Sequence, residues 1–430
     1  MNDLRSLGMA IRSGELSPLE HVTDALDRLA ADEHNAVVTL DREGALAAAA
    51  ALTEELAAGR WRGPLHGVAL GVKDLIDVAG LPTRCGSNVL ADAPPADADA
   101  PAVARLRAAG AVVVAKLHTQ EFAHGPTGDV SATGPARNPH DRTRITGGSS
   151  SGSAAAVAAG YLPLTLGTDT GASVRTPAAL CGVVGLKPRF GALPVDGVFP
   201  LSESCDHVGL LTPDVDSAAF AWEVLSGHRP TELDGLRVGV PVDDYWRPFD
   251  PVLDDAATAA VAGLRAAGAE IVEVRTPMID ELAATYPLIV GNEAYATHAA
   301  WLAERPGDYQ PLIRERLLSF ADRPAKEYID AQRTRHRLVP AFGAAVNGVD
   351  VLVTGTTRLR ATPIGQAEAD GVQVRPALLA LALPFNLTGW PAVSVPAAVD
   401  GLPAGVQIAG VRLEERGVLR VAAVVDPARH

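Results

Sequence analysis

The sequence has no long apolar run, and its first residues do not resemble a leader segment. Its richest apolar stretch, Ala154 to Leu166, is shorter than the roughly 18 residues that span a bilayer, and it contains Gly160 and Pro163. The first residues, Met1 to Arg5, have neither the basic nor the apolar region of a secretory signal. We therefore expect no membrane partner and a cytoplasmic location.

Cysteine is also scarce. The chain has three, Cys85, Cys181 and Cys205, an odd number with no CxxC spacing. This pattern indicates free thiols in a reducing compartment rather than a disulfide framework. Neither Cys85 nor Cys181 has a histidine partner nearby in the sequence, which argues against a thiol nucleophile.

Basic residues are fewer than acidic residues. The chain has 37 Lys and Arg against 51 Asp and Glu, for a net charge of −14. Such acidity repels nucleic acid and anionic lipid, so we expect no nucleic-acid partner. The 41 glycines and 32 prolines form no repeat, and they indicate turns between many short elements.

Helix and strand patterns alternate along the chain. Ser17 to Glu20 forms a capping box with proline at the first helical position, and Ala45 to Ala58 is rich in helix formers. Gly67 to Val72 and Ala111 to Ala115 are compact apolar runs of strand length. This alternation predicts an α/β fold.

We expect one domain over residues 1–430. Residues 1–60 are predicted to form N-terminal helices, 61–225 a catalytic core, and 226–349 a variable helical region that contributes to the substrate site. Residues 350–430 are predicted to return to the core as short apolar strands up to Val425. The polar stretch from Ser226 to Leu233 is interpreted as a linker.

Three segments carry the chemistry: Gly71 to Asp74, Gly147 to Ser153, and Gly167 to Arg175. They offer a lysine after an apolar run, a serine-rich glycine loop, and a serine at the end of a glycine-flanked turn. A serine hydroxyl becomes a good nucleophile when a base removes its proton, and a buried, neutral lysine can be that base. Taken alone, Lys73 also fits a strand-end lysine that reaches solvent.

The glycine–serine loop allows other interpretations. It lacks the Gly-Lys-Ser/Thr ending of a phosphate-binding loop. Gly148 to Gly152 matches a G-x-S-x-G nucleophile elbow around Ser150, but an elbow follows a buried strand, and Asp141 to Thr146 is polar. A flexible linker is disfavoured by the alanine-rich, helix-like stretch that follows, Ser153 to Ala159.

From Gly147 to Ala178 the sequence resembles the amidase signature family of serine hydrolases. The matching residues are Ser149, Ser153, Asp169, Gly171, Ser173, Arg175 and Pro177. The resemblance implies that Ser173 is the nucleophile, that Ser149 bridges it to the base after a cis peptide bond, and that Lys73 is the base. The separations of 24 and 76 residues between them agree with the family pattern.

The resemblance also implies a fold and supporting residues. The expected fold is a single large mixed sheet with helices on both faces. The expected oxyanion hole is formed by backbone N–H groups of Thr170, Gly171, Ala172 and Ser173. Ser150, Asp169 and Arg175 are expected to support the network. Ala172 stands where the family usually has glycine, so the backbone there must accept a Cβ.

The expected activity is hydrolysis of a small carboxylic amide through a serine acyl-enzyme, without metal or organic cofactor. The resemblance leaves room for a homodimer. One alternative is the A-type glutaminase subunit of a tRNA-dependent amidotransferase. Such subunits resemble one another in having an acidic residue shortly before the Pro-x-Asn-Leu segment, whereas Pro376 to Leu383 has none. A second alternative is a catalytically silent binding homologue.

The segment from His118 to His124 has residue types that bind metals, because His118, Glu121 and His124 would share one broad face of a helix. The spacing matches none of the usual zinc patterns and no further cluster accompanies it. We expect this segment to be structural.

Overall fold

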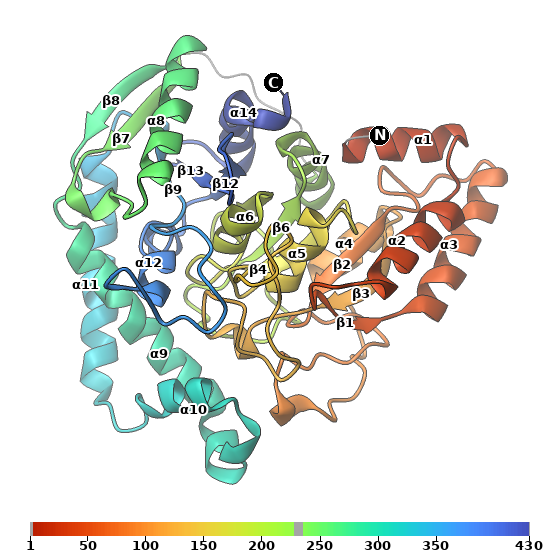
Figure 1. The fold of residues 1–430 in the computed structure, drawn as a ribbon, viewed down its shortest axis with the longest axis horizontal. Coiled ribbons are helices and arrows are strands. Elements are labelled where there is room, and N and C mark those ends of the chain that lie inside the picture. Colours follow the sequence, from red (N-terminus) through yellow and green to blue (C-terminus); the bar gives the residue numbers. More distant parts are fainter. Residues whose placement is uncertain (1–2, 228–234, 430) are drawn as a thin grey trace.

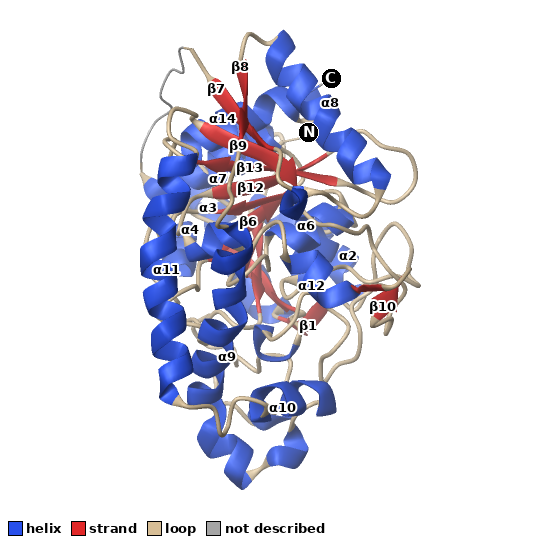
Figure 2. Ribbon diagram, turned by 90° about the vertical axis from the view of Figure 1, so that its left-hand side faces the viewer, coloured by secondary structure: helices blue, strands red, loops and turns tan. Residues whose placement is uncertain are grey.

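The computed structural model of the protein describes residues 3–227 and 235–429. A mixed sheet of 11 strands runs through its centre, with helices on both faces (Figure 2). The strands are β1 (Val37–Leu40), β2 (Ala69–Lys73), β3 (Val112–Leu117), β4 (Thr165–Thr168), β5 (Val184–Lys187), β6 (Val208–Thr212), β7 (Arg237–Pro241), β8 (Glu270–Val274), β9 (Val351–Gly355), β12 (Ala392–Pro396) and β13 (Gly405–Gly410). A separate hairpin pairs β10 (Glu368–Ala369) with β11 (Val372–Gln373).

The α-helices are α1 (Leu4–Ser13), α2 (Pro18–Ala30), α3 (Arg42–Ala57), α4 (Pro101–Ala108), α5 (Ser151–Ala158), α6 (Arg175–Cys181), α7 (Val215–Ser226), α8 (Pro251–Ala266), α9 (Ile279–Glu304), α10 (Pro311–Leu318), α11 (Ala325–Ala345), α12 (Val374–Leu379), α13 (Pro384–Leu387) and α14 (Glu415–Val425). Short 3₁₀ helices are η1 (Asn88–Leu90), η2 (Glu121–Ala123), η3 (Asp244–Trp246), η4 (Pro306–Asp308) and η5 (Pro427–Arg429). Across both described ranges, no helix is long and apolar enough to cross a membrane.

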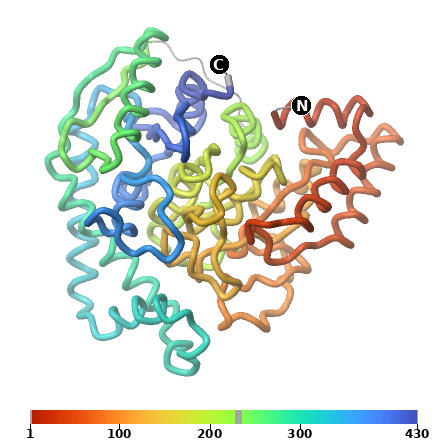
Figure 3. Tube along the Cα trace, viewed as in Figure 1, coloured from red at the N-terminus to blue at the C-terminus, as the bar shows by residue number. Residues whose placement is uncertain are grey.

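The strand order is β1-β3-β2-β4-β6-β5-β12-β13-β9-β7-β8. β2 pairs in parallel with β3 and β4, and β7 with β8 and β9, whereas the central pairs are antiparallel. The C-terminal strands therefore lie between the first half of the chain and the middle region (Figures 1 and 3). This insertion brings residues from three distant parts of the sequence to the centre of one sheet.

Side-chain alternation along the strands directs neighbouring residues into different hydrophobic cores. On β9, Val351 and Val353 join a core with α1, α4, α7, α8 and α14, while Leu352 between them packs with α9, α10 and α11. On β2, Leu70 and Val72 lie in the first core, whereas Ala69 packs on the opposite face with α2, α3 and α5. The fold class expected from the sequence, a mixed sheet covered on both faces, is confirmed.

The local predictions for the first part of the chain agree with the structure. Ser17 caps α2 in a complete capping box with Glu20, because each side chain accepts the other's backbone N–H. The two predicted strands near Gly71 and Val113 are β2 and β3. β6 and α7 were not anticipated. The predicted linker lies mostly outside the described residues, and its first residue, Ser226, ends α7.

The C-terminal prediction needs a correction. Residues 350–410 do contain strands β9, β12 and β13, but α12 and α13 interrupt them, and the chain continues into α14 instead of another strand. In α14 the buried residues Val418, Val421 and Ala422 are spaced three and four apart, which is the period of a helix face rather than of a strand.

Candidate active site

Lys73 ends β2 and points to the face on which α5 packs. This direction follows because successive side chains on a strand point to opposite faces of the sheet, and Leu70 and Val72 point into the core on the other face. The side chain is fully buried, and its Nζ donates to Ser149 Oγ at 2.6 Å and to Thr168 Oγ1 at 2.7 Å. Burial lowers the pKa of Lys73 to about 7, although Asp169 and Asp206 act in the opposite direction.

Ser149 lies in the loop that leads into α5. The Gly148–Ser149 peptide bond is cis, as expected from the sequence. The loop is fixed on both sides, because Gly148 N donates to Pro126 O at 2.7 Å and Gln120 N donates to Ser149 O at 3.2 Å. Ser150 connects the loop to β4, since its hydroxyl donates to Thr168 O at 3.1 Å and accepts from Thr168 N at 3.2 Å.

Ser173 lies in the turn between β4 and α6, and it lines a cavity of about 490 Å³. Its backbone oxygen accepts from Ser150 N at 3.1 Å, which places the turn against the serine loop. Its hydroxyl has no hydrogen-bond partner among the described residues, so the expected contact between the hydroxyls of Ser149 and Ser173 is not formed. Catalytic hydrogen bonds are often long without substrate and shorten when it binds.

The turn before Ser173 presents a row of backbone N–H groups. None of the four N–H groups from Thr170 to Ser173 donates to another group in the described part of the chain. Ala172 is buried, but its φ is not positive, so the alanine fits this turn without strain. The turn is supported at Thr170, whose Oγ1 donates to Asp206 Oδ1 at 2.6 Å. At Gly171 any Cβ would collide with the Tyr286 hydroxyl.

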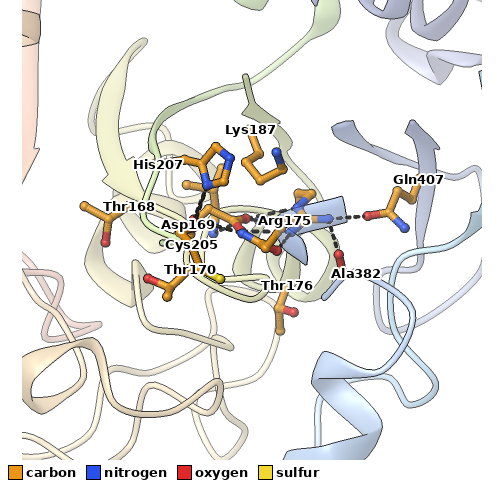
Figure 4. A network of polar contacts seen from close by, with 12 residues as sticks. Thr168, Asp169, Thr170, Arg175, Thr176, Lys187, Cys205, His207, Ala382 and Gln407 are labelled. Atoms are coloured by element: carbon orange, nitrogen blue, oxygen red, sulfur yellow. Dashed lines mark hydrogen bonds and ion pairs between the residues drawn. The ribbon is translucent and has the colours of Figure 1, made fainter. Parts of the chain in front are cut away.

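Asp169 and Arg175 form a buried ion pair behind the turn (Figure 4). The guanidinium donates to both carboxylate oxygens, at 2.8 and 3.0 Å. It also donates to Asn386 Oδ1, Ala382 O and Gln407 Oε1 at 2.6, 2.7 and 2.7 Å, so it connects the turn to the C-terminal part of the chain. Burial by itself raises the pKa of Asp169, but Arg175 outweighs it and holds that pKa well below its usual range.

Asp206 is a second buried carboxylate close to this turn. Besides Thr170, it accepts from the backbone N–H groups of Leu201 and Ser202, each at 3.0 Å. Burial raises the pKa of Asp206 to about 6, against these hydrogen bonds. The ionised carboxylate favours the protonated form of Lys73, in opposition to the effect of burial.

The three residues of the hypothetical metal site do not share a helix face. His118 directly follows β3 and hydrogen-bonds to Ser151 Oγ and Gly134 O at 2.7 and 2.8 Å. Glu121 accepts from Ser87 Oγ and Gln310 N, and His124 lines the cavity. Within residues 3–227 and 235–429, no group of three His, Cys, Asp or Glu side chains is placed to bind a metal ion.

The three cysteines are buried and free. Burial raises the pKa of each thiol, most clearly for Cys85 and Cys181, which disfavours the thiolate form that a nucleophile needs.

Sequence reasoning named Lys73, Ser149 and Ser173 as candidates but missed other residues that surround them. Thr168, the second partner of Lys73, could have been found, because β4 runs parallel to β2 and its end must lie beside the lysine. Tyr286 and Arg375 line the cavity from α9 and α12. No local pattern in the sequence marks these two residues.

Comparison with known proteins places the chain among related enzymes. A family model described as Amidase matches residues 20–419. The A-type subunit of the glutamyl-tRNA(Gln) amidotransferase of Chloroflexus aggregans is 36% identical, over 96% of this chain and 93% of the relative. The AtzE subunit of the 1-carboxybiuret hydrolase of a Pseudomonas species is 36% identical, over 97% and 96%. The solved structure of an amidase matches with a TM-score of 0.93 at 40% identity, covering 99% of both chains.

Proposed function

This chain belongs to the amidase family, and we propose that it is an amidohydrolase that cleaves the C–N bond of a small carboxylic amide through an acyl-enzyme on Ser173. The observation that carries the proposal is the contact of the buried Lys73 with Ser149, in the loop that hydrogen-bonds to the backbone of Ser173, which lines a cavity. A buried lysine with a pKa near 7 is partly neutral at physiological pH and can accept a proton.

The proposed reaction begins with attack of Ser173 Oγ on the amide carbonyl carbon. The hydroxyl proton passes to Ser149 Oγ, and the proton of Ser149 passes to the neutral Nζ of Lys73. The carbonyl oxygen becomes an oxyanion that accepts from the backbone N–H groups of the 170–173 turn. Such pre-oriented donors each contribute about 3–4 kcal/mol to transition-state stabilisation.

Collapse of the tetrahedral intermediate breaks the C–N bond. The proton held by Lys73 returns through Ser149 to the leaving nitrogen, which departs as ammonia or an amine. Water then attacks the ester carbonyl, gives its proton to the same serine–lysine pair, and releases the carboxylic acid while Ser173 regains its proton. The proposed reaction requires no metal and no organic cofactor.

A second candidate, a glutaminase subunit of a tRNA-dependent amidotransferase, is favoured by the relatives that carry that name. Against it, the residues of α12 and the following turn that line the cavity are Arg375, Pro376, Leu379, Ala380 and Leu383, and none is acidic. In this proposal, therefore, the chain is not a glutaminase. The exclusion of a nucleic-acid partner stays a prediction from net charge.

The test is a panel of aliphatic, aryl and peptide amides together with free glutamine, with ammonia or amine release as the readout. We expect turnover of at least one simple amide by the wild-type protein and none by Ser173→Ala. Release of ammonia from glutamine alone would favour the amidotransferase candidate. Failure to cleave any member of a broad panel would contradict the amidase proposal.

A further inference from the structure

The cavity beside Ser173 contains two arginines and no acidic side chain. Arg375 enters it from α12 and Arg316 from α10, and most of the remaining lining is apolar. The chain as a whole has 51 acidic residues and a net charge of −14. A positive, acid-free cavity in such a protein is a local feature that selects for negative charge.

Arg375 is held by neither a hydrogen bond nor an ion pair within the described residues, although it is half-buried. Arginines that support this fold behave differently, since Arg175 and Arg335 each donate to backbone carbonyls, Ala382 O and Leu387 O, at 2.7 and 2.8 Å. The Arg375 guanidinium supports no other part of the described fold and is free to bind an anion that enters the cavity.

Two further polar groups face the same space. Arg316 donates to His124 O at 3.3 Å and is partly balanced by the charge of Asp129. The Nε2 of His124, which also lines the cavity, is buried and has no hydrogen-bond partner in the described part of the chain. Burial, together with the two arginines, holds the pKa of His124 well below its usual value, so the ring is neutral.

Tyr286 lines the cavity and contacts the turn that carries Ser173. Its hydroxyl packs directly against Gly171 in the turn before Ser173. The same tyrosine is the electrostatic neighbour that partly offsets the lowering of the Arg375 pKa by burial. Arg375 and Tyr286 therefore line the same cavity as Ser173, the cavity that the scissile amide must enter.

Building on the proposed amidase function, we propose that the substrate is an amide that also carries a carboxylate, which pairs with Arg375. Arg316 contributes further donors, and so does His124 when its Nε2 carries the ring proton. The planar guanidinium fork fits the two oxygens of a carboxylate.

The test compares matched pairs of amides. Succinamate and glutaramate carry the carboxylate, while 4-oxopentanamide and 5-oxohexanamide replace it with a neutral methyl ketone of similar shape. We expect wild-type kcat/KM to favour the carboxylates. Arg375→Gln should lower kcat/KM for them between about 10-fold and 100-fold, the usual range for a lost charged hydrogen bond, and leave the ketones nearly unchanged. Arg375→Lys should restore part of the loss.

Arg333→Gln is the matched control, since Arg333 is 78% exposed on α11 and outside the cavity. This substitution should change kcat/KM neither for the carboxylate amides nor for the ketone amides. Equal cleavage of carboxylates and ketones by the wild type would overturn the inference while leaving the amidase proposal intact. An equal loss for both series in Arg375→Gln would also overturn it, because Arg375 would then only position Tyr286.

A binding experiment separates this inference from the proposed reaction. Ser173→Ala protein is titrated by calorimetry with glutaramate and with 5-oxohexanamide, and the titration is repeated with Ser173→Ala/Arg375→Gln. Tighter binding of glutaramate that disappears with Arg375 would support the inference even if no amide were cleaved. Equal binding of both ligands, or no binding of either, would contradict it.

Discussion

The Nζ of Lys73 lies 2.6 Å from the Oγ of Ser149, although 76 residues separate them in the sequence. The lysine is fully buried, and its other hydrogen-bond partner is the hydroxyl of Thr168. Two neutral hydroxyls stabilise an ammonium poorly compared with water, which is why burial dominates its pKa. The arrangement therefore suits a lysine that exchanges a proton with Ser149.

The first prediction concerns Ser173. Ser173→Ala should lower kcat by at least about 10⁴-fold, as expected for loss of a serine nucleophile, while the thermal melt stays close to that of the wild type. A sulfonyl fluoride or phosphonate should label Ser173, located by mass spectrometry of the digested protein. Labelling at Ser150 would instead support the nucleophile-elbow interpretation.

The second prediction concerns the ionisation of Lys73. Because the base must be neutral and its pKa is about 7, kcat/KM should fall about tenfold per pH unit as the pH drops below 7. Lys73→Met should be nearly inactive at every pH. A folded Lys73→Met protein that retained most activity at neutral pH would exclude Lys73 as the base.

The third prediction uses Thr168→Val, which removes one acceptor of Lys73 without changing the side-chain volume much. Removing an acceptor takes more hydrogen-bond stabilisation from the charged ammonium form of Lys73 than from the neutral amine. The pKa of Lys73 should therefore fall further. The acidic limb of the pH profile should move to lower pH by roughly one unit.

Thr165→Val provides a matched control for this shift. Thr165 lies on the same strand and is buried, but its hydroxyl donates to Ser153 O rather than contacting Lys73. Its substitution should leave the acidic limb in place. A shift to higher pH in Thr168→Val, or equal shifts in both variants, would contradict the role given to Thr168.

The fourth prediction concerns the Asp169–Arg175 pair. Asp169→Asn leaves a buried guanidinium without its counter-charge and should reduce the free energy of unfolding by about 3–5 kcal/mol. Glu270→Gln breaks the exposed pair with Arg237 and should change it by less than about 1 kcal/mol. Denaturant unfolding of the two variants measures the difference.

The same pair predicts a pH dependence of stability. The pKa of Asp169 is depressed in the folded protein, so its contribution is present above the pKa of the unfolded chain and is lost as pH falls through the folded value. The wild type should therefore lose more stability on acidification than Asp169→Asn. Parallel stability curves for the two proteins would contradict a stabilising, ionised Asp169.

Much of the fold followed from local patterns. The capping box at Ser17 marked the start of α2, and short apolar runs marked β2 and β3, because backbone capping and strand burial leave signatures within a few residues. The same reasoning failed for α14, where an apolar stretch of mixed spacing was interpreted as strand. In a short apolar segment, the 3.6-residue period of a helix and the two-residue period of a strand cannot be told apart by sequence alone.

The sequence alone determined the family and indicated the residues that we propose to carry the chemistry, since the lysine, the glycine–serine loop and the Ser173 turn are each contiguous and ordered along the chain. Only the tertiary structure decided what surrounds them. Asn386 and Gln407 reach Arg175 from more than 200 residues away, and Tyr286 and Arg375 meet at the cavity from separate helices. Local patterns reflect backbone geometry and burial, whereas these contacts depend on how the C-terminal strands insert into the sheet.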